Sequence, residues 1–232
     1  SVVPTTYGEA LDVAVSGNSS VALTLAGSAA TVAVSATGAS TNAKSIAPTV
    51  TLGGAASDLQ SLTVNLTSAR GTSTNAANEY MATFNAGTLA DTGDTSWNEH
   101  LEALSSLKVN GAGVFTINNT GSDAITRVSL TNIDVSGMEA FSNLAVDGTL
   151  ADNVNRSTTS ITLNDLVSEV VNLGGAKDTV VTGSTVPAVD VIVGFQLSAS
   201  ATSATTVDTD RSDVLNVPGT LSFVKFETEA TT

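Results

Sequence analysis

The sequence contains no cysteine, so the chain can form neither a disulfide bond nor a thiolate metal site. Basic residues are scarce as well: the chain has 8 Lys and Arg against 22 Asp and Glu, for a formal net charge of −14. This balance argues against nucleic-acid binding, because contacts to phosphates need Lys and Arg. It is compatible with divalent cations, with high salt or with solubility alone.

Long apolar runs are also absent: no stretch of about 18 apolar residues occurs, and we expect no segment to span a membrane. Aromatic residues make up only 4% of the chain, although hydrophobic residues make up 41%. The core must therefore consist of Val, Leu, Ile and Ala, which suit thin, regularly stacked strands. The chain starts at Ser1 with neither an initiator Met nor a charged region followed by an apolar stretch, so we expect a processed product or a fragment of a longer protein.

Alternation of apolar and polar residues dominates the first half of the chain. The stretches LDVAVSG, SVALTLAG and ATVAVSATG each close on Gly, and they place Val15, Leu25 and Val34 at similar positions about ten residues apart. TVTLGG and LQSLTVNL continue the pattern around Leu52 and Val64. Evenly spaced short strands of this kind are typical of a sandwich, a barrel or a solenoid.

One segment departs from this period. Ser96 and Glu99 have the spacing of a capping box, and leucines then recur at helical intervals up to Leu107. The pattern predicts a short helix over residues 97–107 and a return to strand at Val109.

The predicted fold is all-β: an elongated, parallel β-solenoid-like stack of short strands with one inserted short helix. The alternative is an antiparallel β-sandwich, which usually has more aromatic residues in its core. Polar residues dominate 151–160, which divides the chain into a Ser/Thr/Ala-rich β-region with the helix, 1–150, and a second β-region, 151–232.

No motif of a known catalytic site occurs, and we expect no enzymatic activity. GxSxG and P-loop motifs are absent, and His100, the single His, has no second His or Cys with which to share a metal. Paired carboxylates can cleave glycosides, but a chain so poor in aromatics offers few platforms for sugars. Trp97, the single Trp, is interpreted as a packing anchor.

The C-terminal third contains the most specific pattern. GGAKDTVV, which starts at Gly174, is similar to the calcium-binding repeat GGxGxDxUx, in which Asp supplies oxygens to Ca²⁺ and U is apolar. The fourth-position Gly of that repeat is deleted here. Asp-x-apolar occurs at Asp178 and returns at Asp190 and at Asp213, and the acidic stretch before Asp213 adds Asp208 and Asp210.

These segments resemble the degenerate C-terminal region of RTX-type bacterial surface proteins, in particular S-layer proteins exported by type I secretion. Residues 135–146 and the ending LSFVKFETEA also fit that style. The resemblance implies an extracellular, calcium-stabilised β-structure that tiles a cell surface. It implies calcium ligands at Asp208, Asp210 and Asp213 first, and at Asp178 and Asp190 next.

The predicted function is therefore that of a structural component of a secreted surface layer, which self-assembles into a homo-oligomer or lattice with calcium. One alternative is a domain of a large RTX adhesin that binds a cell or a cell-surface glycan; a concave patch with Trp97 and Tyr80 would favour it, whereas a flat face covered with Ser and Thr would favour the lattice. Another is a subunit of an extracellular filament, with residues 1–15 as the donated strand.

Overall fold

The structure is a computed structural model. It describes residues 10–16, 20–25, 28–36, 48–55, 59–70, 79–88, 104–118, 130–141, 156–164, 167–182, 189–197, 199–200, 203–207 and 212–218.

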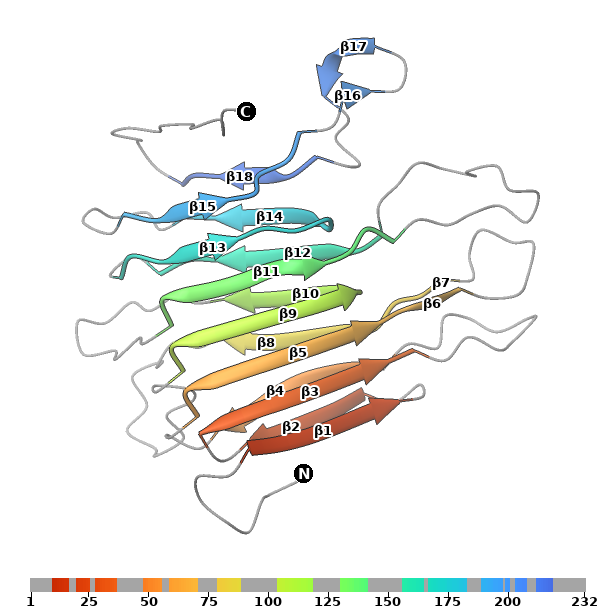
Figure 1. The fold of residues 1–232 in the computed structure, drawn as a ribbon, viewed down its shortest axis with the longest axis vertical. Helices are drawn as coiled ribbons and strands as arrows, with labels where there is room; N and C mark the ends of the chain where they lie inside the picture. The colour runs from red at the N-terminus through yellow and green to blue at the C-terminus, as the bar shows by residue number, and fades with distance from the viewer. Residues whose placement is uncertain are drawn as a thin grey trace, which may run out of the picture.

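Two parallel sheets of seven strands each form the molecule (Figure 1). The first sheet contains, in spatial order, β1 (Ala10–Ser16), β3 (Ala29–Ser35), β5 (Ser61–Thr67), β9 (Ser106–Ala112), β11 (Asn132–Met138), β13 (Val170–Asn172) and β15 (Val191–Val193). The second sheet contains β2 (Ser20–Leu25), β4 (Thr49–Ala55), β8 (Thr83–Thr88), β10 (Val114–Asn118), β12 (Thr158–Thr162), β14 (Lys177–Val181) and β18 (Val214–Asn216).

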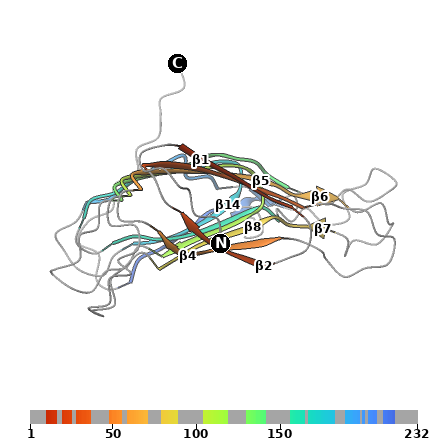
Figure 2. The same cartoon turned by 90° about the horizontal axis from the view of Figure 1, so that it is seen from below.

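The chain alternates between the two sheets, so that one strand of the first sheet and the next strand of the second form one coil of a stack. The strands of the two sheets run in opposite directions in Figure 1, and Figure 2 shows the sheets as two layers that face each other. Two short antiparallel pairs are additions to the coils: β6 (Ala69–Arg70) with β7 (Glu79–Tyr80), and β16 (Ala199–Ser200) with β17 (Ser203–Val207).

The all-β, parallel solenoid-like prediction is confirmed, and the sandwich alternative is not, because neighbouring strands in both large sheets pair in parallel. The spacing of about ten residues corresponds to half a coil. Val15 and Val34 are register partners in the first sheet, whereas Leu25 lies between them in sequence but in the second sheet.

A single core of small aliphatic side chains fills the space between the sheets. In β3 and β5 every second residue is buried, and Val32 and Val64 are register partners that exclude solvent completely. Phe84 and Phe115 are register partners in the second sheet and stack with ring centroids 6.3 Å apart. The predicted Val-, Leu-, Ile- and Ala-rich core is therefore present, with few aromatic additions.

The helix prediction for 97–107 is wrong for residues 104–107, which are the part of it that the structure describes. Leu104 and Ser105 precede a strand, and Ser106 and Leu107 already belong to β9, three residues before the expected return at Val109. Leu107 and Val109 are both buried with a period of two, and β9 pairs in parallel with β5 and β11. Pairing on both sides thus outweighs the helical spacing of the leucines.

Residues 97–103, which include Trp97 and His100, lie outside the described residues. No helix occurs in the part of the chain that the structure describes. Within that part, no helix is long and apolar enough to cross a membrane.

The strands pair across residue 150 in both sheets. β10 pairs with β12, whose first residues lie within the polar stretch 151–160, and β11 pairs with β13, so strands before and after residue 150 belong to the same two ladders. The division into 1–150 and 151–232 stays a prediction from composition.

Candidate functional site

The predicted acidic ligands that the structure describes lie where strands of the last two coils begin. Asp178 is the second residue of β14, Asp190 directly precedes β15, and Asp213 directly precedes β18. Asp208 and Asp210 lie outside the described residues, as does the ending LSFVKFETEA.

Asp178 and Asp213 are brought together by the parallel pairing of β14 with β18. The backbone N–H of Asp178 donates to Oδ1 of Asp213 at 3.0 Å. The second carboxylate oxygen, Oδ2 of Asp213, accepts the backbone N–H of Gln196 at 2.6 Å. Asp213 therefore connects the start of β18 to the preceding coil and to its own coil.

The Asp178 side chain points in the opposite direction along the stack, to β12. The hydroxyl of Thr159, its register partner, donates to Oδ1 at 2.5 Å. The backbone N–H of Gly174 donates to Oδ2 at 3.3 Å. Thr159, Asp178 and Asp213 thus form a polar ladder across three neighbouring coils.

Burial determines the protonation of this ladder. Asp178 is fully buried and Asp213 almost so. Burial, together with the nearby charge of Asp213, raises the pKa of Asp178 to about 7, against the opposing effect of the Thr159 hydrogen bond. Burial also raises the pKa of Asp213, whereas the N–H groups of Asp178 and Gln196 oppose this rise.

Asp190 belongs to the other sheet and has a different partner. Its Oδ1 accepts the backbone N–H of Glu169 at 3.2 Å. Glu169 is itself fully buried, and its Oε2 accepts the backbone N–H of Asn164 at 2.8 Å. The three predicted aspartates therefore divide into the Asp178–Asp213 pair and a separate Asp190–Glu169 contact.

Thr159 and Glu169 were not predicted as part of this site. Both carry a signal that the sequence contains, because Thr159-Ser-Ile161 and Glu169-Val-Val171 repeat the polar-x-apolar spacing of Asp178-Thr-Val180. A search for polar-x-apolar triplets, rather than for Asp alone, would have found them.

The described carboxylates supply only part of a calcium site. Ca²⁺ takes roughly six to eight oxygen ligands, and the carboxylates of Asp178 and Asp213 also accept N–H or O–H donors, which are not ligands. Among the described residues, no group of three or more His, Cys, Asp or Glu side chains lies together. A carboxylate oxygen keeps a further lone pair after one hydrogen bond, so completion by Asp208 and Asp210 stays a prediction.

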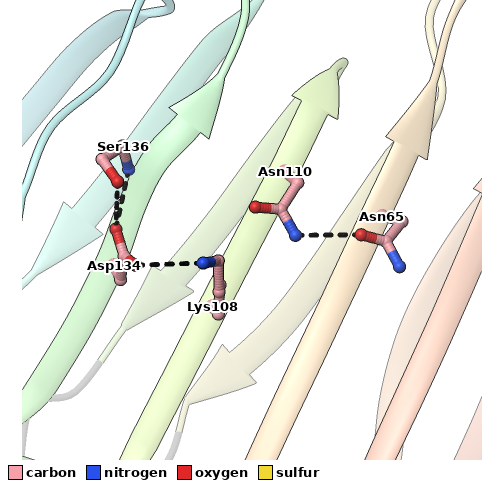
Figure 3. A network of polar contacts seen from close by, with 5 residues as sticks. All are labelled: Asn65, Lys108, Asn110, Asp134 and Ser136. Atoms are coloured by element: carbon pink, nitrogen blue, oxygen red, sulfur yellow. Dashed lines mark hydrogen bonds and ion pairs between the residues drawn. The ribbon is translucent and has the colours of Figure 1, made fainter.

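The outer face of the first sheet is polar and bonded between strands (Figure 3). Asn110 Nδ2 donates to Asn65 Oδ1 at 2.9 Å, and Lys108 Nζ lies 3.6 Å from Asp134 Oδ2. Partial burial acts to raise the pKa of Asp134, but hydrogen bonds from Ser136 and the charge of Lys108 outweigh it, so the pKa lies below its usual value. Tyr80, which a ligand-binding patch would need on the surface, is fully buried.

Comparison with protein-family models, with curated proteins and with solved structures finds no match to this chain. The fold itself defines the class: a two-sheet, parallel β-solenoid-like stack whose last coils contain a buried ladder of acidic side chains.

Proposed function

We propose that the protein is a structural component of a secreted bacterial surface layer, in which copies of the chain assemble with calcium. The observation that carries the proposal is the open stack: both seven-stranded sheets end, among the described residues, in strands paired on one side only. Unpaired edges with the backbone groups of a parallel ladder are templates for another chain.

The outer faces of the two sheets support a layer component over a ligand-binding adhesin. The outward positions of β3, β5, β10 and β12 are mainly Thr, Ser, Asn and Ala. A concave patch with Trp97 and Tyr80 would favour the adhesin alternative, but Tyr80 is fully buried and Trp97 lies outside the described residues. A filament built by strand donation is also less favoured, because β1 already pairs with β3 of its own chain over residues 10–16.

The reason to include calcium in the proposal is the group of aspartates at the starts of β14, β15 and β18. A cation near Asp178 and Asp213 would offset like charges that the fold places close together, and it would lower the net charge of −14 that opposes association. The residues that would hold it are Asp213 with Asp208 and Asp210, and next Asp178 and Asp190.

Light scattering and circular dichroism, with EGTA and then with millimolar Ca²⁺, test this proposal. We expect calcium to increase the β signal and to produce large assemblies, whereas equal Mg²⁺, the control for screening, should have a smaller effect. Asp213→Asn should weaken the response to calcium. If wild-type protein stays monomeric with and without calcium, the surface-layer proposal is wrong.

A further inference from the structure

We infer that the two open ends of the stack join head to tail, so that β1 and β2 of one copy extend the sheets of another copy beyond its β15 and β18. The inference rests on the proposed function, since both require self-association, and it adds the partner surface and its register.

The strands of the first sheet are in continuous register up to the middle of β11, where one irregularity shifts the pairing with β9 after Asp134. One outward-facing column of register partners passes through all seven strands: Asp12, Thr31, Thr63, Lys108, Asp134, Asn172 and Val193. The next position in this column, beyond Val193, is where a translated copy would place its own Asp12.

The second sheet has a column of the same kind. Its members are Ala22, Thr51, Asn85, Thr116, Ser160, Thr179 and Val214. A translated copy would therefore place Ala22 beside Val214 by the same displacement that places Asp12 beside Val193. A single translation of a second copy along the stack therefore continues the strand pairing of both sheets. This is the geometric argument for a second copy of the chain as the partner.

Some apolar side chains at the two ends are incompletely covered, although Val13, Leu23 and Leu25 of the first coil are buried. Val32, Val64 and Val109, in inner coils, are fully buried. In contrast, Val15 at one end and Ile192 at the other pack against the same core but are only partly buried. The same holds for Val21 in the first coil and for Phe195 and Leu215 in the last. A stacked copy would cover both ends at once.

The edge strands of the last coil lack the features that block edge pairing. β15 and β18 contain neither a charged residue nor Pro, which natural edges commonly use against association. Three of their four outward side chains are apolar and exposed, Val191 by 49%, Val193 by 47% and Val214 by 43%, and the fourth is the uncharged Asn216. At the other end, Asp12 is the one charged residue of β1 and β2.

A head-to-tail contact is heterologous, because different surfaces of the two copies meet. Such a contact does not close on itself when the displacement is a translation along the stack, and it produces a row of copies. A row of this kind is a suitable element of a surface layer.

Cysteine crosslinking tests the register directly, because the chain has no cysteine of its own. Neighbouring strands lie about 4.8 Å apart, within the Cα separation of roughly 4.4–6.8 Å that a disulfide spans. Asp12→Cys and Val193→Cys are prepared as separate proteins, mixed under assembling conditions and oxidised. We expect a 12–193 disulfide dimer in the mixture and none in either variant alone. Ser16→Cys, at the far end of β1, is the matched control for Asp12→Cys and should give several-fold less crosslink with Val193→Cys.

Ala22→Cys with Val214→Cys repeats the test on the second sheet. Both pairs should crosslink, and circular dichroism should show that each variant folds as the wild type does. Crosslinking within one variant alone indicates head-to-head contact and overturns the inference. Assemblies in light scattering without either mixed crosslink also overturn it, but leave the proposed function intact. If wild-type protein forms no assemblies, both fail.

Discussion

At the residue scale, one column of register partners on the inner face of the second sheet changes from aromatic to polar side chains along the stack. Phe84, Phe115, Thr159 and Asp178 are successive register partners, and Asp178 then donates its N–H to Asp213. This column is thus aromatic in the middle coils and acidic in the last ones, within a core that is otherwise mainly aliphatic. Buried carboxylates destabilise a core unless they are hydrogen-bonded, and Asp178 and Asp213 both have such partners.

The raised pKa of Asp178 predicts that the protein is more stable in mild acid than at high pH. The native state holds a proton on Asp178 that the unfolded chain, with a carboxyl pKa of 3.8, has released, so rising pH favours unfolding until about pH 7. Each unit in that interval changes the free energy of unfolding by up to about 1.4 kcal/mol. Urea unfolding at several pH values from about 5 to about 8 measures this.

Asp178→Asn should remove most of this pH dependence. Asp134→Asn is the control, because the pKa of Asp134 is shifted in the opposite direction and its loss should not flatten the profile. A wild-type protein that is more stable at about pH 8 than at about pH 5 would contradict the prediction.

Gly111 is a second position where one residue decides the local structure. Its φ is +86°, and a Cβ placed there would overlap the carbonyl oxygen of Leu66 on the neighbouring strand. We expect Gly111→Ala to cost about 2–4 kcal/mol in the free energy of unfolding, since strain and overlap both act.

Gly87→Ala is the matched comparison for Gly111→Ala. Gly87 also has a positive φ, of +73°, but the nearest atom to its Cβ position is 3.9 Å away. Its substitution should show the cost of the backbone angle alone, about 1 kcal/mol. Equal losses for the two variants in denaturant titrations would show that the overlap with Leu66 has no effect.

At the element scale, the last coil is connected to the stack by side chains as well as by ladders. β15 and β18 are three residues long, shorter than β1 and β2 at the other end, which have seven and six residues. Asp213 and Asp190 add hydrogen bonds to backbone N–H groups of the preceding coil. The carboxylates therefore compensate for short strands.

Asp213→Ala should release this coil without unfolding the rest. Loss of the carboxylate leaves the N–H groups of Asp178 and Gln196 without an acceptor, at a cost of about 1–3 kcal/mol each when they stay buried. Hydrogen exchange should speed up in β15 and β18 and stay unchanged in β3 and β5. Asp134→Ala, which removes an acid from the outer face, is the control. Uniform loss of protection across all strands would contradict the prediction.

The strands could be predicted from the sequence to a large extent, but their partners could not. Alternation around Val32 and Val64 indicates a strand in any β-fold, and only the parallel pairing of these two valines distinguishes a solenoid from a sandwich. Coils also differ in length, since β6–β7 and β16–β17 interrupt two of them. For this reason the sequence could not show that Asp178 meets Asp213 across 35 positions, or that Asp190 belongs to the opposite sheet.

The error at residues 104–107, the described end of the predicted helix, has a physical reason of the same kind. The leucine spacing that suggests a helix ends at Leu107, and Leu107 is also two positions before Val109. Both side chains are buried, which is the alternation of a strand. Which period holds is decided by neighbouring strands β5 and β11, which are far away in sequence.

At the scale of the whole molecule, the strands of the stack pair in parallel at each internal step, and the described ends are paired on one side only. One column of register partners passes through all seven strands of each large sheet, although three strand pairs contain a register shift elsewhere, and another copy can continue both columns. The net charge of −14 opposes this association, and calcium bound to the aspartates at the starts of β14, β15 and β18 would reduce the repulsion.

The most direct test of this account is light scattering in millimolar Ca²⁺ with a charge placed on the open edge. Val214→Lys puts an ammonium group on β18, where the inferred register places the neutral Ala22 of the next copy, and Thr179→Lys, its register partner one strand inside the stack, is the matched control on the same face. We predict that wild type and Thr179→Lys form large assemblies, whereas Val214→Lys stays monomeric with an unchanged circular dichroism spectrum. Assembly of Val214→Lys to the same extent as wild type would contradict the claim that the open edges join the copies.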